Sequence, residues 1–122
     1  MDLRWALHIV EERRDDVLVL TLAGRLSAAS AVRLEAAVAE AAGRGDVRLV
    51  IDLTGVDYLS SAGLRALAEA AGLCAHGHGA LALCGLVDAV RMAIDFGGLA
   101  AQVPIEPSRD LAIIRVATPS VP

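Results

Sequence analysis

The chain has 122 residues, of which 56% are hydrophobic, and its formal net charge is −4 at pH 7. This length is typical of one domain, and the apolar content is high enough to fill one core. Nucleic-acid binding is disfavoured, because it requires a basic surface and often aromatic side chains, and only 2% of this chain is aromatic. We expect one domain over residues 1–117 and a disordered tail at 118–122, where two prolines occur without apolar periodicity.

The first elements predict an antiparallel hairpin. Large apolar residues occupy every second position from 3 to 9, which is the pattern of a half-buried strand: Leu3, Trp5, Leu7 and Ile9. An apolar run at 17–22 predicts the second strand. The charged cluster at 11–16 separates the two, and we expect it to form the hairpin connection.

A helix and a central strand follow the hairpin. Apolar residues recur at helical spacing after Gly24, at Leu34, Ala37, Val38 and Ala41. Either Ser27 or Ser30 is suitable as the cap of this helix. The β-branched run at 47–53 predicts a strand in the middle of a sheet, with Asp52 at its end.

The remaining elements alternate between helix and strand. A second helix is expected at about 62–75, with its inward face made by Leu64, Leu67, Ala68 and Ala71. We then expect a strand at 80–84, a helix at about 88–96, a strand around 103–105 and a last helix capped by Ser108. This order predicts an α/β fold, with a mixed central sheet of about five strands, the first one antiparallel, packed with about four helices.

The cysteines and the first residues of the chain indicate the cellular compartment in which the protein is expected. Cys74 and Cys84 lack the Cys-x-x-Cys spacing of a zinc or redox site, so we expect buried free thiols. Residues 1–5 have neither the basic stretch nor the apolar run of a secretory signal, and charged residues interrupt every long apolar segment. We expect a cytoplasmic protein without membrane insertion.

The most informative stretch is 52–65, where a strand is expected to end, turn and enter a helix through Ser60 and Ser61. The carboxyl ends of strands are the usual place for ligands in open α/β sheets, and a helix amino terminus offers unpaired N–H groups and partial positive charge. A serine at such a place can hold a phosphate. By residue type alone, however, a helix cap is the commoner role, so the local chemistry leaves both interpretations open.

The run Leu-x-x-Val-x-x-Leu-Ser-Ser-Ala-Gly-Leu-Arg at 53–65 resembles the signature of the STAS domain, named for sulfate transporters and anti-sigma factor antagonists. The resemblance extends to 22–26, 83–86 and 96–99, and it implies a STAS-like single domain. Stand-alone bacterial members of the family are anti-sigma factor antagonists. In them, the serine two places before the motif glycine is phosphorylated by a partner kinase that is itself the anti-sigma factor. Here that position is Ser61.

The resemblance implies a partner switch for this chain. The unmodified domain would bind the anti-sigma factor and so release a sigma factor, and phosphorylation of Ser61 would break the complex. The partner-binding residues that it implies are Ser27, Tyr58, Ser60, Ala62, Gly63 and Arg65. A phosphatase is a further implied partner, and the domain is expected to be a monomer or a weak homodimer. Many phosphorylated relatives have aspartates where this chain has Ser60 and Ser27.

An enzyme is not expected, and neither a cofactor nor a metal is. His76 and His78 lie in a glycine-rich turn without a third metal ligand nearby in the sequence, so a solvated loop is the preferred interpretation. Asp52 and Asp57 have no base or cofactor motif beside them, and we expect Asp52 to bond loop N–H groups and Asp57 to be exposed. The chain contains no lysine, which excludes a Gly-x-x-x-x-Gly-Lys phosphate loop.

Two other functions remain open at this stage. A STAS domain can serve as a docking subunit of a lipid-transport ATP-binding-cassette assembly or of a sensory complex, without phosphorylation. The other alternative is the binding of a nucleotide or a lipid at the strand-end crevice, where Ala28, Ala29 and Ala62 are small enough to leave space.

Overall fold

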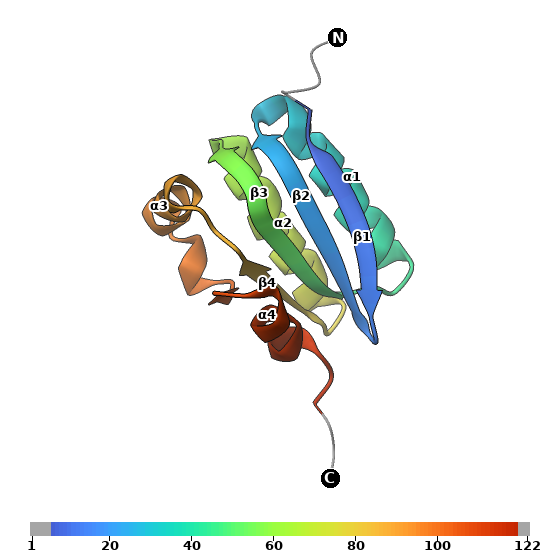
Figure 1. Cartoon of the computed structure of the whole chain (residues 1–122). Coiled ribbons are helices and arrows are strands. Elements are labelled where there is room, and N and C mark those ends of the chain that lie inside the picture. The colour runs from blue at the N-terminus through green and yellow to red at the C-terminus, as the bar shows by residue number, and fades with distance from the viewer. Residues whose placement is uncertain (1–5, 120–122) are drawn as a thin grey trace.

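The structure is a computed structural model, which describes residues 6–119 and contains one mixed sheet with helices on both faces (Figure 1). The strands are β1 (His8–Arg14), β2 (Val17–Leu26), β3 (Arg48–Leu59), β4 (Ala80–Cys84) and β5 (Ile105–Glu106). The helices are α1 (Ala28–Gly43), α2 (Ser61–His76), α3 (Asp88–Gly97) and α4 (Arg109–Val116), with a short 3₁₀ turn at Leu99–Ala101. The predicted α/β architecture, with its antiparallel first strand, is confirmed.

The strand order in the sheet is β1-β2-β3-β4-β5. β1 and β2 form an antiparallel hairpin, and every other neighbouring pair is parallel. Parallel neighbours need a crossover, which α1 supplies between β2 and β3 and α2 between β3 and β4. Both crossover helices lie on one face of the sheet, so their amino termini come together at the carboxyl ends of β2 and β3 (Figure 1).

The core is thick on one face of the sheet and thin on the other. The main cluster lies between the sheet and the helices α1 and α2. The second cluster lies under α4 and consists of Val17, Val19, Val50, Ala82, Cys84, Ala112 and Val116. Both cysteines are buried free thiols, as predicted, and burial raises the pKa of each to about 11.

The charged cluster at 11–16 is not the hairpin connection, so that prediction is wrong. β1 continues through the cluster to Arg14, and the turn contains only Asp15 and Asp16. The charges are tolerated because β1 is an edge strand whose side chains reach solvent or an ionic partner: Arg13 binds Asp46 at 2.8 Å. The predicted strand residues Leu3 and Trp5 lie outside the described part of the chain.

The central strand β3 is longer than predicted, and Asp52 lies inside it rather than at its end. Pairing with β2 continues to the Leu26–Leu59 pair, across two register shifts in the ladder. Gly55 allows the strands to approach closely at the first shift, because a Cβ there would lie 2.9 Å from the carbonyl oxygen of Leu22. The expected turn before the second helix is therefore absent, and Ser60 alone separates β3 from α2.

The inward face of α2 also differs from the prediction. Its buried residues are Gly63, Ala66, Leu67, Ala70 and Cys74, whereas Leu64, Ala68 and Ala71 are half-buried at the border of the core. Leu64 also contacts α3, because its side chain occupies the space where a Cβ on Gly97 would lie. The helix is thus rotated toward its small residues, which let it pack closely on the sheet.

The last elements agree with the predicted order, with a shift in one strand. β5 contains only Ile105–Glu106, and Val103 is buried just before it. Ser108 caps α4 as predicted, accepting a hydrogen bond from the Leu111 N–H. In the predicted tail, the Thr118 N–H donates to the Asp16 carboxylate at 3.1 Å. Residues 120–122 of the tail lie outside the described part of the chain.

No helix between residues 6 and 119 has the length and apolar character that a bilayer crossing requires.

Candidate functional site

Two strand–helix junctions meet at one end of the sheet. β2 ends at Leu26 and β3 at Leu59, which are paired, and the Ser60 N–H donates to the Leu26 carbonyl at 2.9 Å. Each strand is followed by one capping serine, Ser27 before α1 and Ser60 before α2. We call this region, with Ser27, Ser60 and Ser61, the serine corner.

Two of the serine hydroxyls in the corner are used by the fold. The Ser60 Oγ accepts the Gly63 N–H at 3.0 Å. The Ser27 Oγ accepts the Ser30 N–H, and the Ser30 Oγ accepts the Ser27 N–H at 2.9 Å, which is a reciprocal capping box. Of the two candidate caps of α1, the structure therefore selects Ser27, and it buries Ser30 as the supporting residue.

Ser61 differs from its two neighbours in the corner. It is the first residue of α2 and is exposed, and within residues 6–119 its hydroxyl makes no hydrogen bond. The first turn of α2 contains no acidic residue, and neither does that of α1 beside it. An accessible hydroxyl thus lies at the positive end of a helix dipole, where an added anionic group is favoured.

Gly63 makes this geometry possible. A Cβ at this position would lie 2.7 Å from the carbonyl oxygen of Leu26 and 2.9 Å from a methyl group of Leu59. Only glycine lets α2 begin so close to the ends of both strands. Gly63 is buried, so its part in the predicted partner surface is indirect: it positions Ser60 and Ser61.

The other predicted partner-binding residues surround the corner. Tyr58 is 40% exposed, and the Arg25 guanidinium stacks on its ring, 4.1 Å from the centroid. Ala62 is half-buried, and Arg65 is exposed one turn after Ser61. The structure therefore brings the predicted set together around the start of α2.

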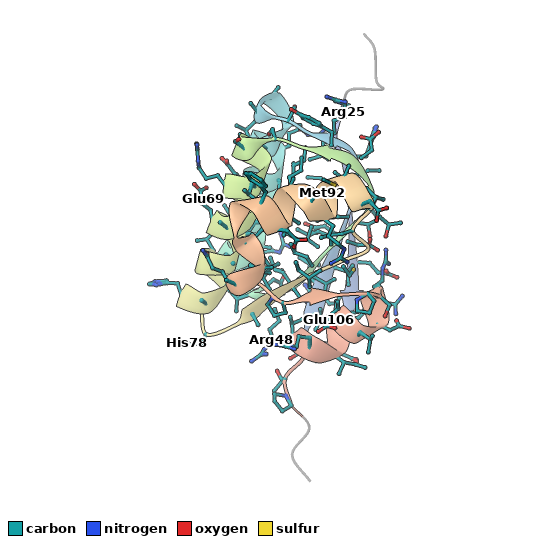
Figure 2. The ribbon with its side chains drawn as sticks, turned by 90° about the vertical axis from the view of Figure 1, so that its left-hand side faces the viewer. Arg25, Arg48, Glu69, His78, Met92 and Glu106 are labelled. Carbon is teal, nitrogen blue, oxygen red and sulfur yellow. The ribbon has the colours of Figure 1, made fainter. Side chains whose placement is uncertain are left out.

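An apolar groove of about 440 Å³ opens beside Ser61, between α2 and α3. We call it the α2–α3 groove, and its lining residues are Leu59, Ser60, Ser61, Leu64, Met92, Ala93, Phe96 and Gly97. Phe96 is 97% exposed and Met92 is 70% exposed, which is unusual for side chains of this kind. Figure 2 shows Met92 on the outer surface of α3.

Met92 and Phe96 were not among the predicted site residues. The signal was present in the helical spacing, because Val90 and Ile94 form the buried face of α3, and residues 92 and 96 fall on another side. None of the three alanines predicted to leave space for a small ligand, Ala28, Ala29 and Ala62, lines this groove.

The remaining candidate residues lie away from the corner. His76 is exposed as the last residue of α2, and His78 is exposed just after it (Figure 2). No cluster of three potential metal ligands occurs between residues 6 and 119. Asp57 is exposed, as expected. The α2–α3 groove itself is lined by no titratable side chain.

Asp52 has a structural role. Its carboxylate accepts the Thr54 N–H at 2.9 Å, and Arg109 donates to it from Nε and Nη2 at 3.1 and 2.9 Å. Arg109 also reaches Glu12 and Thr21, so one guanidinium links α4 to three strands. Burial alone would raise the pKa of Asp52, but the hydrogen bonds from Thr54 and Arg109 together lower it below its usual value.

Comparison with known proteins identifies the family. The sequence model of the STAS domain family matches residues 8–112 of the chain. The chain belongs to the STAS domain family. A relative of this STAS domain, BtrV of Bordetella bronchiseptica, is named as an anti-sigma factor antagonist; the two are 34% identical over 106 residues, which cover 87% of this chain and 91% of BtrV.

Solved structures agree with this assignment. An anti-sigma factor antagonist from Mycobacterium paratuberculosis superposes with a TM-score of 0.83 at 28% identity, covering 90% of this STAS domain and 93% of that chain. The Bacillus antagonist SpoIIAA in its unphosphorylated form has the same fold, with a TM-score of 0.76, 19% identity and coverage of 88% and 95%. SpoIIAA has also been solved in a phosphorylated form, which superposes with a TM-score of 0.69 at 18% identity, covering 88% of this STAS domain and 98% of that chain.

Proposed function

We propose that this STAS domain is an anti-sigma factor antagonist that is controlled by phosphorylation of Ser61. The unmodified domain binds an anti-sigma factor, which is also a serine kinase, through the serine corner, and a sigma factor is released. The kinase then transfers the γ-phosphoryl group of ATP to the Ser61 Oγ; ADP leaves and the hydroxyl proton is lost. In this role the chain is a cytoplasmic binding protein and the substrate of another enzyme.

The observation that carries the proposal is the difference between two adjacent serines. The Ser60 hydroxyl is engaged as the helix cap, 3.0 Å from the Gly63 N–H, and is half-buried. The Ser61 hydroxyl is exposed and makes no bond within the described residues. A kinase can therefore reach Ser61 without disturbing the cap, whereas modification of Ser60 would break it.

Phosphorylation at this position suits a switch. A phosphoserine carries about −1.5 to −2 charges at neutral pH, and the free domain tolerates them at the amino terminus of α2. A partner packed over Ser61 would have to desolvate the phosphate and accommodate its charge. The same group is therefore tolerated in the free protein and disruptive in the complex.

The α2–α3 groove supplies the apolar part of the proposed partner surface. Phe96 and Met92 are exposed next to Ser61, and aromatic side chains and methionine are enriched at protein interfaces relative to the rest of the surface. Tyr58 adds a second exposed aromatic ring at the corner. A surface with apolar anchors beside a hydroxyl group suits a protein partner.

The two serines that replace aspartates are compatible with this role. Ser27 and Ser60 both cap helices, and serine and aspartate are comparably good caps, so the local structure is retained. Their neutral hydroxyls add no negative charge beside a phosphate on Ser61. The relatives support the proposal further: BtrV is named as an antagonist, and SpoIIAA exists in phosphorylated and unphosphorylated forms.

The proposal is tested with purified protein, ATP and the candidate switch kinases encoded by the same genome. We expect mass spectrometry to find one phosphate on Ser61, and the phosphorylated protein to lose affinity for the kinase. Ser61→Ala should abolish the modification. Ser108→Ala, which removes the cap of α4 on the other face of the sheet, should leave it intact. Phosphate on another residue, or equal affinity before and after phosphorylation, would exclude the proposed switch.

A further inference from the structure

Arg65 is placed to respond to a phosphate on Ser61. The two residues are four apart in α2, so their side chains emerge from the same side of the helix, with Cβ atoms about 5–6 Å apart. Both are exposed, and within residues 6–119 neither side chain makes a hydrogen bond or an ion pair. Arg65 is therefore a cation with no fixed partner in the described part of the chain, one turn away from the proposed phosphorylation site.

Arg65 has one acidic neighbour on α2 itself, Glu69. The α2–α3 groove beside Ser61 is lined without charge, and the first turns of α1 and α2 contain no acidic residue. Glu69 lies four residues beyond Arg65 on α2 and points outward (Figure 2). An acid that precedes its base by four positions pairs better than one that follows it, so a phosphate at Ser61 has the advantage over Glu69.

Other charged residues occur on the neighbouring elements. They are Arg33, Glu35 and Glu40 on α1, which packs against α2, Arg25 at the end of β2, Asp57 near the end of β3, and Asp88, Arg91 and Asp95 on α3. Arg25 is already stacked on Tyr58. Among the charged groups on α2 itself, Arg65 is the cation closest in sequence to Ser61.

We propose that Arg65 is the intramolecular partner of the phosphate on Ser61, and that phosphorylation withdraws this guanidinium from the surface presented to the anti-sigma factor. The inference rests on the proposed function. A phosphate offers three strong acceptor oxygens, and a guanidinium can donate to two of them at once. Phosphorylation then acts twice: it adds negative charge to the corner and occupies a cation that the partner would otherwise contact.

The pairing is measured by the titration of the phosphate. An adjacent guanidinium favours the dianion, so it lowers the second pKa of phosphoserine from its usual value of about 6. We expect Arg65→Gln to raise this pKa by roughly 0.2–0.4, and Arg65→Lys to raise it less. Phosphorus NMR of protein that carries phosphoserine at position 61, installed during translation, reports the pKa directly.

The control is Arg14→Gln. This variant removes the same charge from the hairpin end of β1, at the opposite end of the sheet from the serine corner, and should leave the phosphate pKa unchanged. An equal pKa in the wild type and in Arg65→Gln, or an equal rise in Arg14→Gln, overturns the inference. Because the phosphoserine is installed without a kinase, this result is independent of whether a kinase modifies Ser61, which is what the proposed function requires.

Discussion

Gly63 lies so close to the Leu26 carbonyl that no side chain fits at position 63, where the second crossover helix meets the second strand. A side chain at position 63 would begin 2.7 Å from the Leu26 carbonyl oxygen, which in turn accepts the Ser60 N–H. This contact sets the distance between α2 and the sheet.

Gly63→Ala should destabilise the fold by about 1–3 kcal/mol, because backbone must move to admit the methyl group. Gly72→Ala is the matched control in the same helix: its Cβ would meet nothing within 4 Å. Alanine there should stabilise the protein by roughly 0.5–1 kcal/mol, because it favours the helix. Urea unfolding measures both, and equal effects of the two substitutions would contradict the packing role of Gly63.

Ser60→Ala should lower the stability of the fold, whereas Ser61→Ala should abolish phosphorylation and leave the stability nearly unchanged. The first removes the hydrogen bond to Gly63 and should cost about 1 kcal/mol of unfolding free energy. The second removes an exposed hydroxyl and should change stability by less than about 0.5 kcal/mol, yet abolish phosphorylation. Thermal unfolding and phosphate mass spectrometry, run on both variants, give the two readouts. A large stability loss in Ser61→Ala would show that its hydroxyl is structural.

Phe96→Ala should weaken binding to the anti-sigma factor about tenfold, which is about 1.4 kcal/mol, without loss of stability. The side chain is 97% exposed, so its removal costs the fold little. Ile114→Ala is the control, because Ile114 is 72% exposed on α4, which covers the opposite face of the sheet. Calorimetric titration measures the affinity of both variants for the anti-sigma factor. If Ile114→Ala weakens binding as much as Phe96→Ala does, the α2–α3 groove is not the partner surface.

Asp52→Asn should lower the unfolding free energy by about 1.5–3 kcal/mol at pH 7, because the carboxylate that binds Arg109 and Thr54 is lost. The pKa of Asp52 is lowered in the folded protein, so the carboxylate stabilises the fold above its unfolded pKa of about 3.9. That contribution disappears as the pH falls through the folded pKa. The difference between wild type and variant should therefore be constant near neutrality and shrink below about pH 4. A difference that does not vary with pH would contradict the ionic role.

Most of the architecture was predictable from the spacing of apolar residues. The run at 17–22 and the helical repeat from Leu34 to Ala41 identified β2 and α1, because burial on one face imposes a period. The end of β1 was misplaced, because charge is excluded from a core but not from an edge strand. The length of β3 was also missed, since its last residues alternate weakly and are held by pairing with β2, which a local pattern does not reveal.

The site was predictable in part. The signature at 53–65 predicts Ser61 and its neighbours as the site, and this stays a prediction. Which serine caps α2 depends on the position of Gly63 against Leu26, two residues that are 37 apart in the sequence. The contribution of α3 was missed for a similar reason. Phe96 meets the corner only because α3 packs beside Leu64, and no sequence motif encodes that approach.

Because Ser60 alone connects β3 to α2, its backbone amide should report in NMR spectra on any movement of the start of α2. Because the Ser60 amide is bonded to the Leu26 carbonyl, any displacement of the helix start alters the electronic environment of a backbone group fixed to the sheet. In isotope-labelled protein, the amide resonances of residues 26, 60 and 63 should therefore shift when Ser61 is phosphorylated. These shifts would report the modification without an added label, also when partner proteins are present.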